Sequence, residues 1–186
     1  MKSLFYFFLA LTLFSCSQPT ASNSLYKKEI VDLDQTFATM DSNYRLFESA
    51  KVDTLKLIRD SANKKYNRIK SVYQSDFIDT KFEEIMLIAR GQLVKKLAKI
   101  EGNSSKIENE YSYSTKQYRN LRENLIHETL EKEESLIFFS EEKNALILLN
   151  AEIVNFNESI QNTMSIATTI LPQLDSIIDV HEPKPE

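Results

Sequence analysis

Residues 25–49 read LYKKEIVDLDQTFATMDSNYRLFES. Apolar residues recur in this segment at alternating steps of three and four, at Ile30, Leu33, Phe37, Met40, Tyr44 and Phe47. This spacing is a heptad repeat, which places one apolar stripe along an α-helix and so favours packing against other helices. The segment carries the most regular pattern in the chain, and it predicts a helix from about residue 25 to residue 49.

The rest of the chain also favours helices, because residues that break them are scarce. The sequence has four prolines and two glycines, and no proline lies between Pro19 and Pro172. An all-β domain needs many tight turns, and the residues that form such turns are missing here. We therefore expect an all-α fold, an elongated antiparallel bundle of four or five helices with coiled-coil-like packing.

Several local signals predict where the helices begin and end. A second helix is expected from about Val52 to Tyr73, although the join contains neither glycine nor proline, so one helix from 25 to 73 is an alternative. A capping box at Thr80–Glu83 predicts the next start. A second capping box at 105–108 follows Gly102 and predicts a turn, with Gly102 as the left-handed C′ residue.

The segment from Ser105 to Leu171 has no glycine or proline. A single helix of that length would be about 100 Å long, so we expect a break between residues 128 and 135. Pro172 is expected to kink or end the last helix. These boundaries predict a bundle over residues 25–178 and a disordered tail over 179–186.

The apolar stripe of the last helix is interrupted by Lys143 and Asn150. A buried asparagine on such a seam often sets the register between helices, so Asn150 is a candidate for that role. In the other interpretation, the helix rotates slightly and Ile147 and Val154 face the core.

The chain begins with Lys2, an apolar run from Leu4 to Phe14, and the only cysteine. The run has eleven residues, too few to cross a bilayer as a helix, which needs about 20. The motif Leu13-Phe14-Ser15-Cys16 resembles the lipobox of bacterial lipoproteins, although Phe14 is a less usual residue at its position. An ordinary secretory signal cleaved nearby is the alternative, because Ser15 and Ser17 are small enough for general signal peptidase.

The lipobox resemblance implies that residues 1–15 are a signal peptide removed by cleavage and that residues 16–24 are a lipidated linker. Cys16 would carry a diacylglycerol and an acyl chain such as palmitate, and two or more chains anchor a protein stably to a membrane. Ser17 follows the cysteine, where an aspartate retains some lipoproteins in the inner membrane. The resemblance therefore implies an outer-membrane lipoprotein that faces the periplasm.

Charge and motifs argue against several other classes of protein. The net charge is −4 with both signs interspersed, so a nucleic-acid partner is not expected. The chain has too few glycines for a phosphate-binding loop and lacks the common hydrolase and zinc motifs. The residue three before His127 is Asn124, which does not fit the paired Glu-x-x-His motifs of di-iron bundles. We expect no enzyme activity, no catalytic residue, no metal site and no cofactor.

Aromatic residues alternate with arginines between residues 111 and 122. Helical spacing places Tyr111 and Tyr118 on the core-facing stripe. Tyr113, Arg119 and Arg122 remain as the predicted interaction surface, since tyrosine and arginine are enriched where proteins bind partners.

These observations favour a lipid-anchored envelope protein with a non-enzymatic role as scaffold, spacer or adaptor. The expected partner is another envelope protein or a cell-wall polymer, and self-association stays open. The alternative is a periplasmic binding module that holds a small or apolar ligand between its helices.

Overall fold

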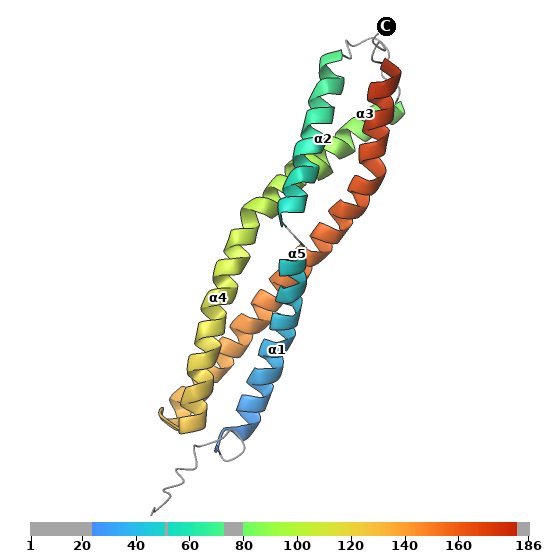
Figure 1. The fold of residues 1–186 in the computed structure, drawn as a ribbon. Helices are drawn as coiled ribbons and strands as arrows, with labels where there is room; N and C mark the ends of the chain where they lie inside the picture. The colour runs from blue at the N-terminus through green and yellow to red at the C-terminus, as the bar shows by residue number, and fades with distance from the viewer. Residues whose placement is uncertain (1–23, 51, 73–79, 182–186) are drawn as a thin grey trace, which may run out of the picture.

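The fold is given by a computed structural model, which describes residues 24–50, 52–72 and 80–181. Within these residues the chain forms helices and turns and contains no strand. The helices lie side by side as three long rods (Figure 1). The predicted all-α class and the elongated antiparallel bundle are confirmed.

Each rod has a different make-up. The first rod is α1 (Lys27–Ser49) and α2 (Val52–Val72), the second is α3 (Thr80–Ile88), the π-helical η1 (Ala89–Lys96) and α4 (Leu97–His127), and the third is α5 (Lys132–His181). The second rod is continuous and runs opposite to α1, α2 and α5 (Figure 1). At 1.5 Å per residue, the 50-residue α5 is about 75 Å long.

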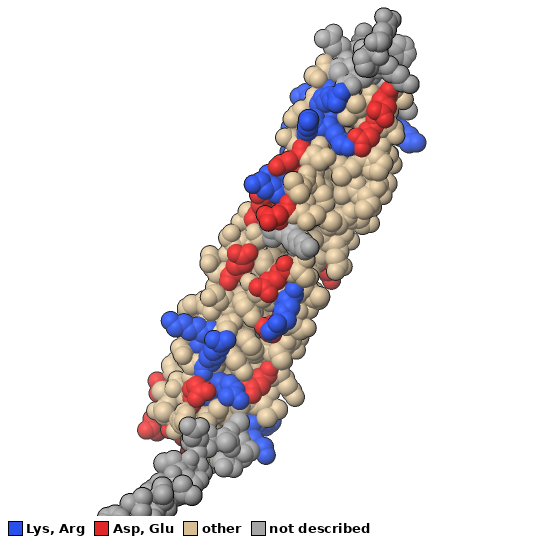
Figure 2. Space-filling model, viewed as in Figure 1, with Lys and Arg blue, Asp and Glu red and all other residues tan. Residues whose placement is uncertain are grey.

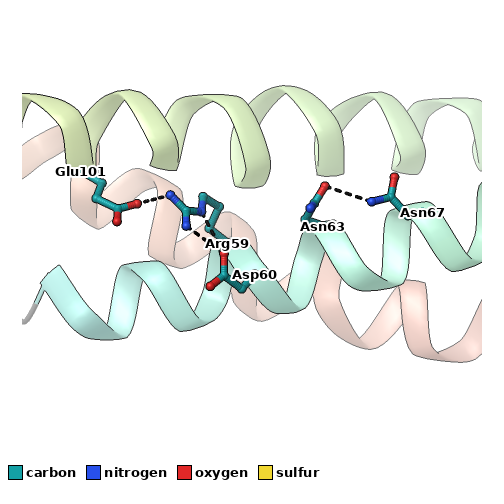
Figure 3. Close-up of polar contacts among 5 residues, drawn as sticks. All are labelled: Arg59, Asp60, Asn63, Asn67 and Glu101. Atoms are coloured by element: carbon teal, nitrogen blue, oxygen red, sulfur yellow. Dashed lines mark hydrogen bonds and ion pairs between the residues drawn. The ribbon is translucent and has the colours of Figure 1, made fainter.

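The first rod is interrupted, so the prediction of two helices holds and the single helix from 25 to 73 is wrong. The backbone N–H of Ala50 donates to the carbonyl of Phe47, which closes the last turn of α1. Beyond the break, α2 is joined to α4 through Arg59, which donates to Glu101 and to its neighbour Asp60 (Figure 3). This contact joins the first half of α2 to α4.

The predicted turn at residues 102–104 is wrong. Gly102 and Ser105 are exposed positions inside α4, and no described glycine has positive φ. The apolar stripe continues through this region at Ile100, Ser104 and Ile107, all buried. Burying an isoleucine contributes roughly 1.5–3 kcal/mol, which outweighs the cost of about 1 kcal/mol for a mid-helix glycine.

The π-helical segment corrects the direction of the apolar stripe in the second rod. Ile85, Ala89, Leu93 and Leu97 are buried at steps of four residues. Four residues exceed one α-helical turn by about 40°, so three such steps would rotate the stripe away from the core. The wider turn of a π-helix absorbs the additional residue, and all four side chains stay inside.

The core has two clusters along the bundle. The larger joins α1 and α4 to residues 146–160 of α5, and the smaller joins α2, α3 and η1 to residues 167–174 of α5. Ile58 packs against both clusters. The apolar interior is therefore continuous past the break in the first rod.

The predicted break between residues 128 and 135 is confirmed, since α4 ends at His127 and α5 begins at Lys132. Glu128 takes the left-handed conformation, with φ of 53°, that was predicted for Gly102. The first described residues lie at this turn: the hydroxyl of Ser24 donates to the carbonyl of Leu125 at 2.7 Å, and the N–H of Leu25 donates to the Glu128 carboxylate at 2.9 Å. We call this end of the bundle the near end and the opposite end the far end.

Polar residues spaced by seven set the register of α5 against α1. Lys143 Nζ donates to Asp32 at 2.5 Å, and Asn43 Nδ2 donates to Asn150 Oδ1 at 2.8 Å. Asn157 Nδ2 donates to the carbonyl of Asn43 at 3.0 Å. Lys143 Nζ, Asn150 Oδ1 and Asn157 Nδ2 each meet a polar group of α1, which offsets the cost of turning these side chains toward that helix.

These contacts support the interpretation of Asn150 as a register residue. The rotated alternative is wrong at Ile147, which is 47% exposed, while Val154 is half-buried. The sequence of α5 alone leaves both interpretations open because the decisive partner, Asn43, lies on another helix.

The helix α5 continues past Pro172 to His181, so the proline does not end it. The remainder of the predicted tail, residues 182–186, lies outside the described residues, as do residues 1–23. Among the helices that the structure describes, none has both the length and the apolar character needed to cross a membrane.

Gly102→Ala is expected to raise the free energy of unfolding by about 0.5–1 kcal/mol, because alanine removes the entropic penalty of a mid-helix glycine. An added Cβ meets no atom within 4 Å. Urea denaturation followed by circular dichroism measures the change.

Ser105→Ala is the matched control. In the middle of α4 this substitution is expected to be neutral or slightly stabilising, whereas loss of an N-cap serine costs about 1 kcal/mol. Destabilisation by both substitutions would mean that a turn exists at residues 102–105 after all.

Candidate functional site

A ladder of aromatic rings and carboxylates joins α1 to α4 in the near half of the bundle. On α1, Asp34 and Asp41 are seven residues apart, as are Phe37 and Tyr44; on α4, Tyr111 and Tyr118 have the same spacing. Seven residues are close to two helical turns, so each pair lies along one line of its helix. The two helices therefore meet through two similar sets of contacts.

The set nearer the chain start contains Phe37, Tyr118, Asp34 and Arg122. The rings of Phe37 and Tyr118 stack with centroids 4.0 Å apart. The Tyr118 hydroxyl donates to Asp34 Oδ1 at 2.7 Å, and Arg122 Nε donates to both oxygens of Asp34 at 2.9 and 3.2 Å. One carboxylate thus accepts from two residues of α4.

The second set contains Tyr44, Tyr111, Asp41 and Arg45. The rings of Tyr44 and Tyr111 stack with centroids 3.5 Å apart and an interplanar angle of 1°. The Tyr111 hydroxyl donates to Asp41, which also accepts from Arg45 Nε at 2.9 Å. Here the arginine comes from α1 instead of α4, so the two sets are alike in chemistry but not identical.

The contacts within the ladder shift the pKa values of both tyrosines and of Asp41. Burial and the nearby carboxylates raise the pKa of Tyr111 and of Tyr118 to about 12. The hydroxyl of Tyr111, followed by Arg45, lowers the pKa of Asp41. At neutral pH both tyrosines are therefore neutral donors, and Asp41 is an ionised acceptor.

An open groove runs beside the second set. It is lined by Tyr44, Glu48, Glu108, Tyr111, Ser112, Thr115, Lys116, Arg119 and Asn120. Its volume of about 590 Å³ falls in the usual range for small-ligand pockets. The lining has two carboxylates, two cations and the edges of two stacked rings, so it suits a partner that carries both charges and an apolar or sugar-like face.

The residues predicted as an interaction surface lie in three different settings. Arg119 is exposed and lines the groove. Arg122 is bound to Asp34 and serves the contact between α1 and α4. Tyr113 is 62% exposed and accepts from Gln117 Nε2 at 2.9 Å; it lies about 120° around α4 from Arg119. Of the three, Arg119 alone lies on the groove.

Asp34 and Asp41 were not predicted from the sequence as part of the site. A signal was present, because the pattern Asp-x-x-aromatic occurs twice in α1 at an interval of seven. The pattern does not reveal that the acceptors face Tyr118 and Tyr111, since this depends on how α1 is placed against α4.

The remaining candidates from the sequence are His127, any metal site and Cys16. His127 is half exposed at the end of α4, with Nε2 3.3 Å from the carboxylate of Glu123. Across residues 24–50, 52–72 and 80–181, no three His, Cys, Asp or Glu side chains come together in a group that could hold a metal ion. Cys16, the predicted lipidation site, lies outside the described residues.

Comparison of the chain with models of known protein families, with curated proteins and with solved structures found no match. The assignment of a function therefore depends on the residues and contacts described above.

Replacing both ladder tyrosines, Tyr111→Phe and Tyr118→Phe, should lower the free energy of unfolding at neutral pH by about 1 kcal/mol for each lost hydrogen bond. The double substitution should also reduce the loss of the free energy of unfolding that occurs between about pH 10 and pH 12. A pKa raised in the folded state from 10 to about 12 stabilises the fold below pH 10, and this contribution is lost as the pH rises toward 12. Urea denaturation at several pH values tests both effects.

Tyr113→Phe is the control, because this side chain is 62% exposed and its hydroxyl accepts a hydrogen bond from Gln117 of the same helix. It should leave both the stability and its pH dependence unchanged. Equal alkaline losses of stability in the wild type and in the double variant would show that the ladder hydroxyls do not titrate as described.

Proposed function

We propose that this protein is a lipid-anchored component of the bacterial cell envelope that acts as a spacer or adaptor. In this proposal Cys16 carries the lipid, and the bundle presents its surface to a second envelope protein or to a cell-wall polymer. The observation that carries the proposal is the lipobox-like motif at 13–16, followed after a short linker by a rod whose first described residues lie at one end.

The position of the chain start supports the spacer role. Ser24 and Leu25 are bound to the α4–α5 turn, so a lipid at Cys16 would tether the near end of the bundle. The seven residues from 17 to 23 span at most about 25 Å when extended. With α5 about 75 Å long, the far end of the bundle can extend well beyond the reach of the linker.

The groove on α1 and α4 supports the adaptor role. It is open along the side of the rod, and its charged residues Glu48, Glu108, Lys116 and Arg119 surround the stacked rings. A rod with an open, mixed-charge groove suits recognition of an extended partner.

The alternative proposal is a binding module for a small ligand. The same groove favours it by volume, whereas a ligand held between the helices would need space that buried side chains such as Leu33, Phe47 and Ile153 occupy. The adaptor role requires less rearrangement of the packed core than a ligand held between the helices would.

Lipidation predicts that the wild-type protein, expressed in a bacterial host, is found in the membrane fraction with a mass above that of the polypeptide. Cys16→Ser should remove both the added mass and the membrane retention, because the sulfur is the attachment atom. Intact-mass measurement of both forms provides the test, with Ser17→Ala as a control that keeps the cysteine. A wild-type protein that is soluble and unmodified would contradict the proposal.

A photoreactive residue at position 119 should form a distinct adduct with an envelope protein or cell-wall fragment, because Arg119 lies on the groove. The same residue at position 57 is the control, since Leu57 is 70% exposed on α2 and away from the groove. Equal labelling from both positions would argue against the groove as the contact surface.

A further inference from the structure

Among the described residues, the two halves of the bundle carry opposite net charge. The far half, residues 52–72, 80–100 and 159–181, has eleven Lys and Arg against six Asp and Glu. The near half, residues 24–50 and 101–158, has nine Lys and Arg against seventeen Asp and Glu. The described chain is therefore a rod that is basic at one end and acidic at the other.

This distribution bears on how two copies of the rod can lie beside each other. In a parallel arrangement, acidic halves would meet and basic halves would meet, which costs energy at close approach. In an antiparallel arrangement, each basic half lies against an acidic half. At physiological salt the Debye length is about 8 Å, so the preference acts mainly between rods in contact.

One face of α5 is suited to such contact because it carries a single charged residue. Its residues share the side of the helix opposite the core, are all exposed, and form what we call the outer strip: Ile137, Ser140, Asn144, Ile147, Leu148, Ala151, Asn155, Glu158, Asn162, Ser165, Thr169 and Ser176. Glu158 is its one charged member. Between Asn144 and Leu174 the whole helix has two charged residues, Glu152 and Glu158.

The other helices differ sharply from this pattern. The 21-residue α2 alone contains eight charged side chains. Figure 2 shows charged side chains of both signs over much of the visible face, whereas the right side of the rod, below the acidic side chains near its upper end, is largely tan. A long, nearly uncharged face on the outside of a highly charged bundle is a candidate protein contact.

The strip also exposes large apolar side chains. Ile137 is 54% exposed, Ile147 is 47% exposed and Leu148 is 71% exposed. Ala151, Asn155 and Ser165 are smaller, which allows a second helix to approach closely in the centre of the strip. Burial of this face removes apolar surface from water without stranding a cluster of charges.

The area is sufficient for a stable pair. The strip from Ile137 to Ser176 is about 60 Å long and about 10 Å wide, which offers roughly 600 Å² of surface, so two copies would bury about 1,200 Å² in total. This meets the lower limit of the usual range of about 1,200–2,000 Å² for specific protein interfaces.

We propose that two copies of this chain associate through their α5 outer strips in the antiparallel sense. The same face serves both copies, so a two-fold axis relates them and the assembly closes as a dimer. The nearly uncharged strips form the centre of the interface, and the acidic half of each copy flanks the basic half of the other.

A consequence follows that rests on the proposed function. If each copy is anchored by lipid at its near end, an antiparallel dimer holds its two anchors at opposite ends. Such a dimer would join two membrane surfaces instead of standing on one. The dimer itself does not require the lipid, so an unlipidated chain can test it separately.

The first experiment measures the mass of residues 17–186 by sedimentation equilibrium over a range of concentrations. We expect a reversible dimer whose dissociation constant rises at least about tenfold in about 1 M sodium chloride, where the Debye length falls to about 3 Å. A protein that stays monomeric at all concentrations would overturn the proposal. A dissociation constant that does not change with salt concentration would overturn the role of the charged halves.

Two matched variants locate the interface. Leu148→Glu adds a charge within the strip and should raise the dissociation constant at least about tenfold. Leu57→Lys changes a leucine of nearly equal exposure on α2, 70% against 71%, and should leave it unchanged. Both substitutions increase the charge difference between the halves, so an effect of Leu148→Glu alone reports on the strip. Equal effects, or none, would overturn the assignment to α5.

The second experiment determines direction. Residues 17–186 contain no cysteine, so Ile137→Cys and Ser176→Cys can be introduced one at a time, near opposite ends of the strip. With a bis-maleimide, the antiparallel dimer should give crosslinked product when the two variants are mixed and little from either alone. Efficient crosslinking of each variant to itself would show a parallel pair and overturn the proposal. Circular dichroism of each variant confirms that it is folded.

Discussion

The bundle depends on keeping an apolar stripe directed inward along helices of up to 50 residues. An α-helix has 3.6 residues per turn, so a heptad pattern drifts by about 20° every seven residues. Over such lengths the drift would carry the stripe onto the surface. The first rod meets this constraint by ending one helix at Ser49 and beginning the next at Val52, and the second meets it with the π-helical turns of η1. The third rod stays helical throughout and is held against α1 by Lys143, Asn150 and Asn157.

The same constraint explains which features of the fold could be predicted from the sequence. The heptad pattern of residues 25–49 identifies the core of α1, since Ile30, Leu33, Met40, Tyr44 and Phe47 are all buried. The scarcity of glycine and proline correctly indicates an all-α fold. Gly102 and Ser105 suggest a helix end only from the few residues around them. The structure continues the helix there because the buried residues on either side, Ile100 and Ile107, pack against the other two rods. A glycine costs about 1 kcal/mol in a helix, which the burial of Ile100 and Ile107 exceeds.

The polar contacts were harder to predict. The apolar pattern of a helix shows which side faces the core. It does not show how far the helix is shifted along its axis relative to a neighbouring helix. The pairing of Tyr118 with Asp34, and of Asn43 with Asn150, requires the relative height of two helices to within about one residue. The sequence therefore located a tyrosine and arginine cluster on α4, while only the structure separates Arg122, which joins helices, from Arg119, which lines a groove. The net charge of −4 likewise conceals the opposite charges of the two halves.

The attachment of Ser24 and Leu25 to the α4–α5 turn also has a mechanical meaning. A force that pulls on the chain start, with the far end of the bundle held, acts along the helix axes. The contacts of α1 with α4 and α5 would then be loaded in shear, so the stacked rings and the polar pairs must slip together. A pull across the axis would instead peel α1 away one turn at a time. With Ser24 and Leu25 at the end of the rod, the bundle can therefore bear tension along its axis.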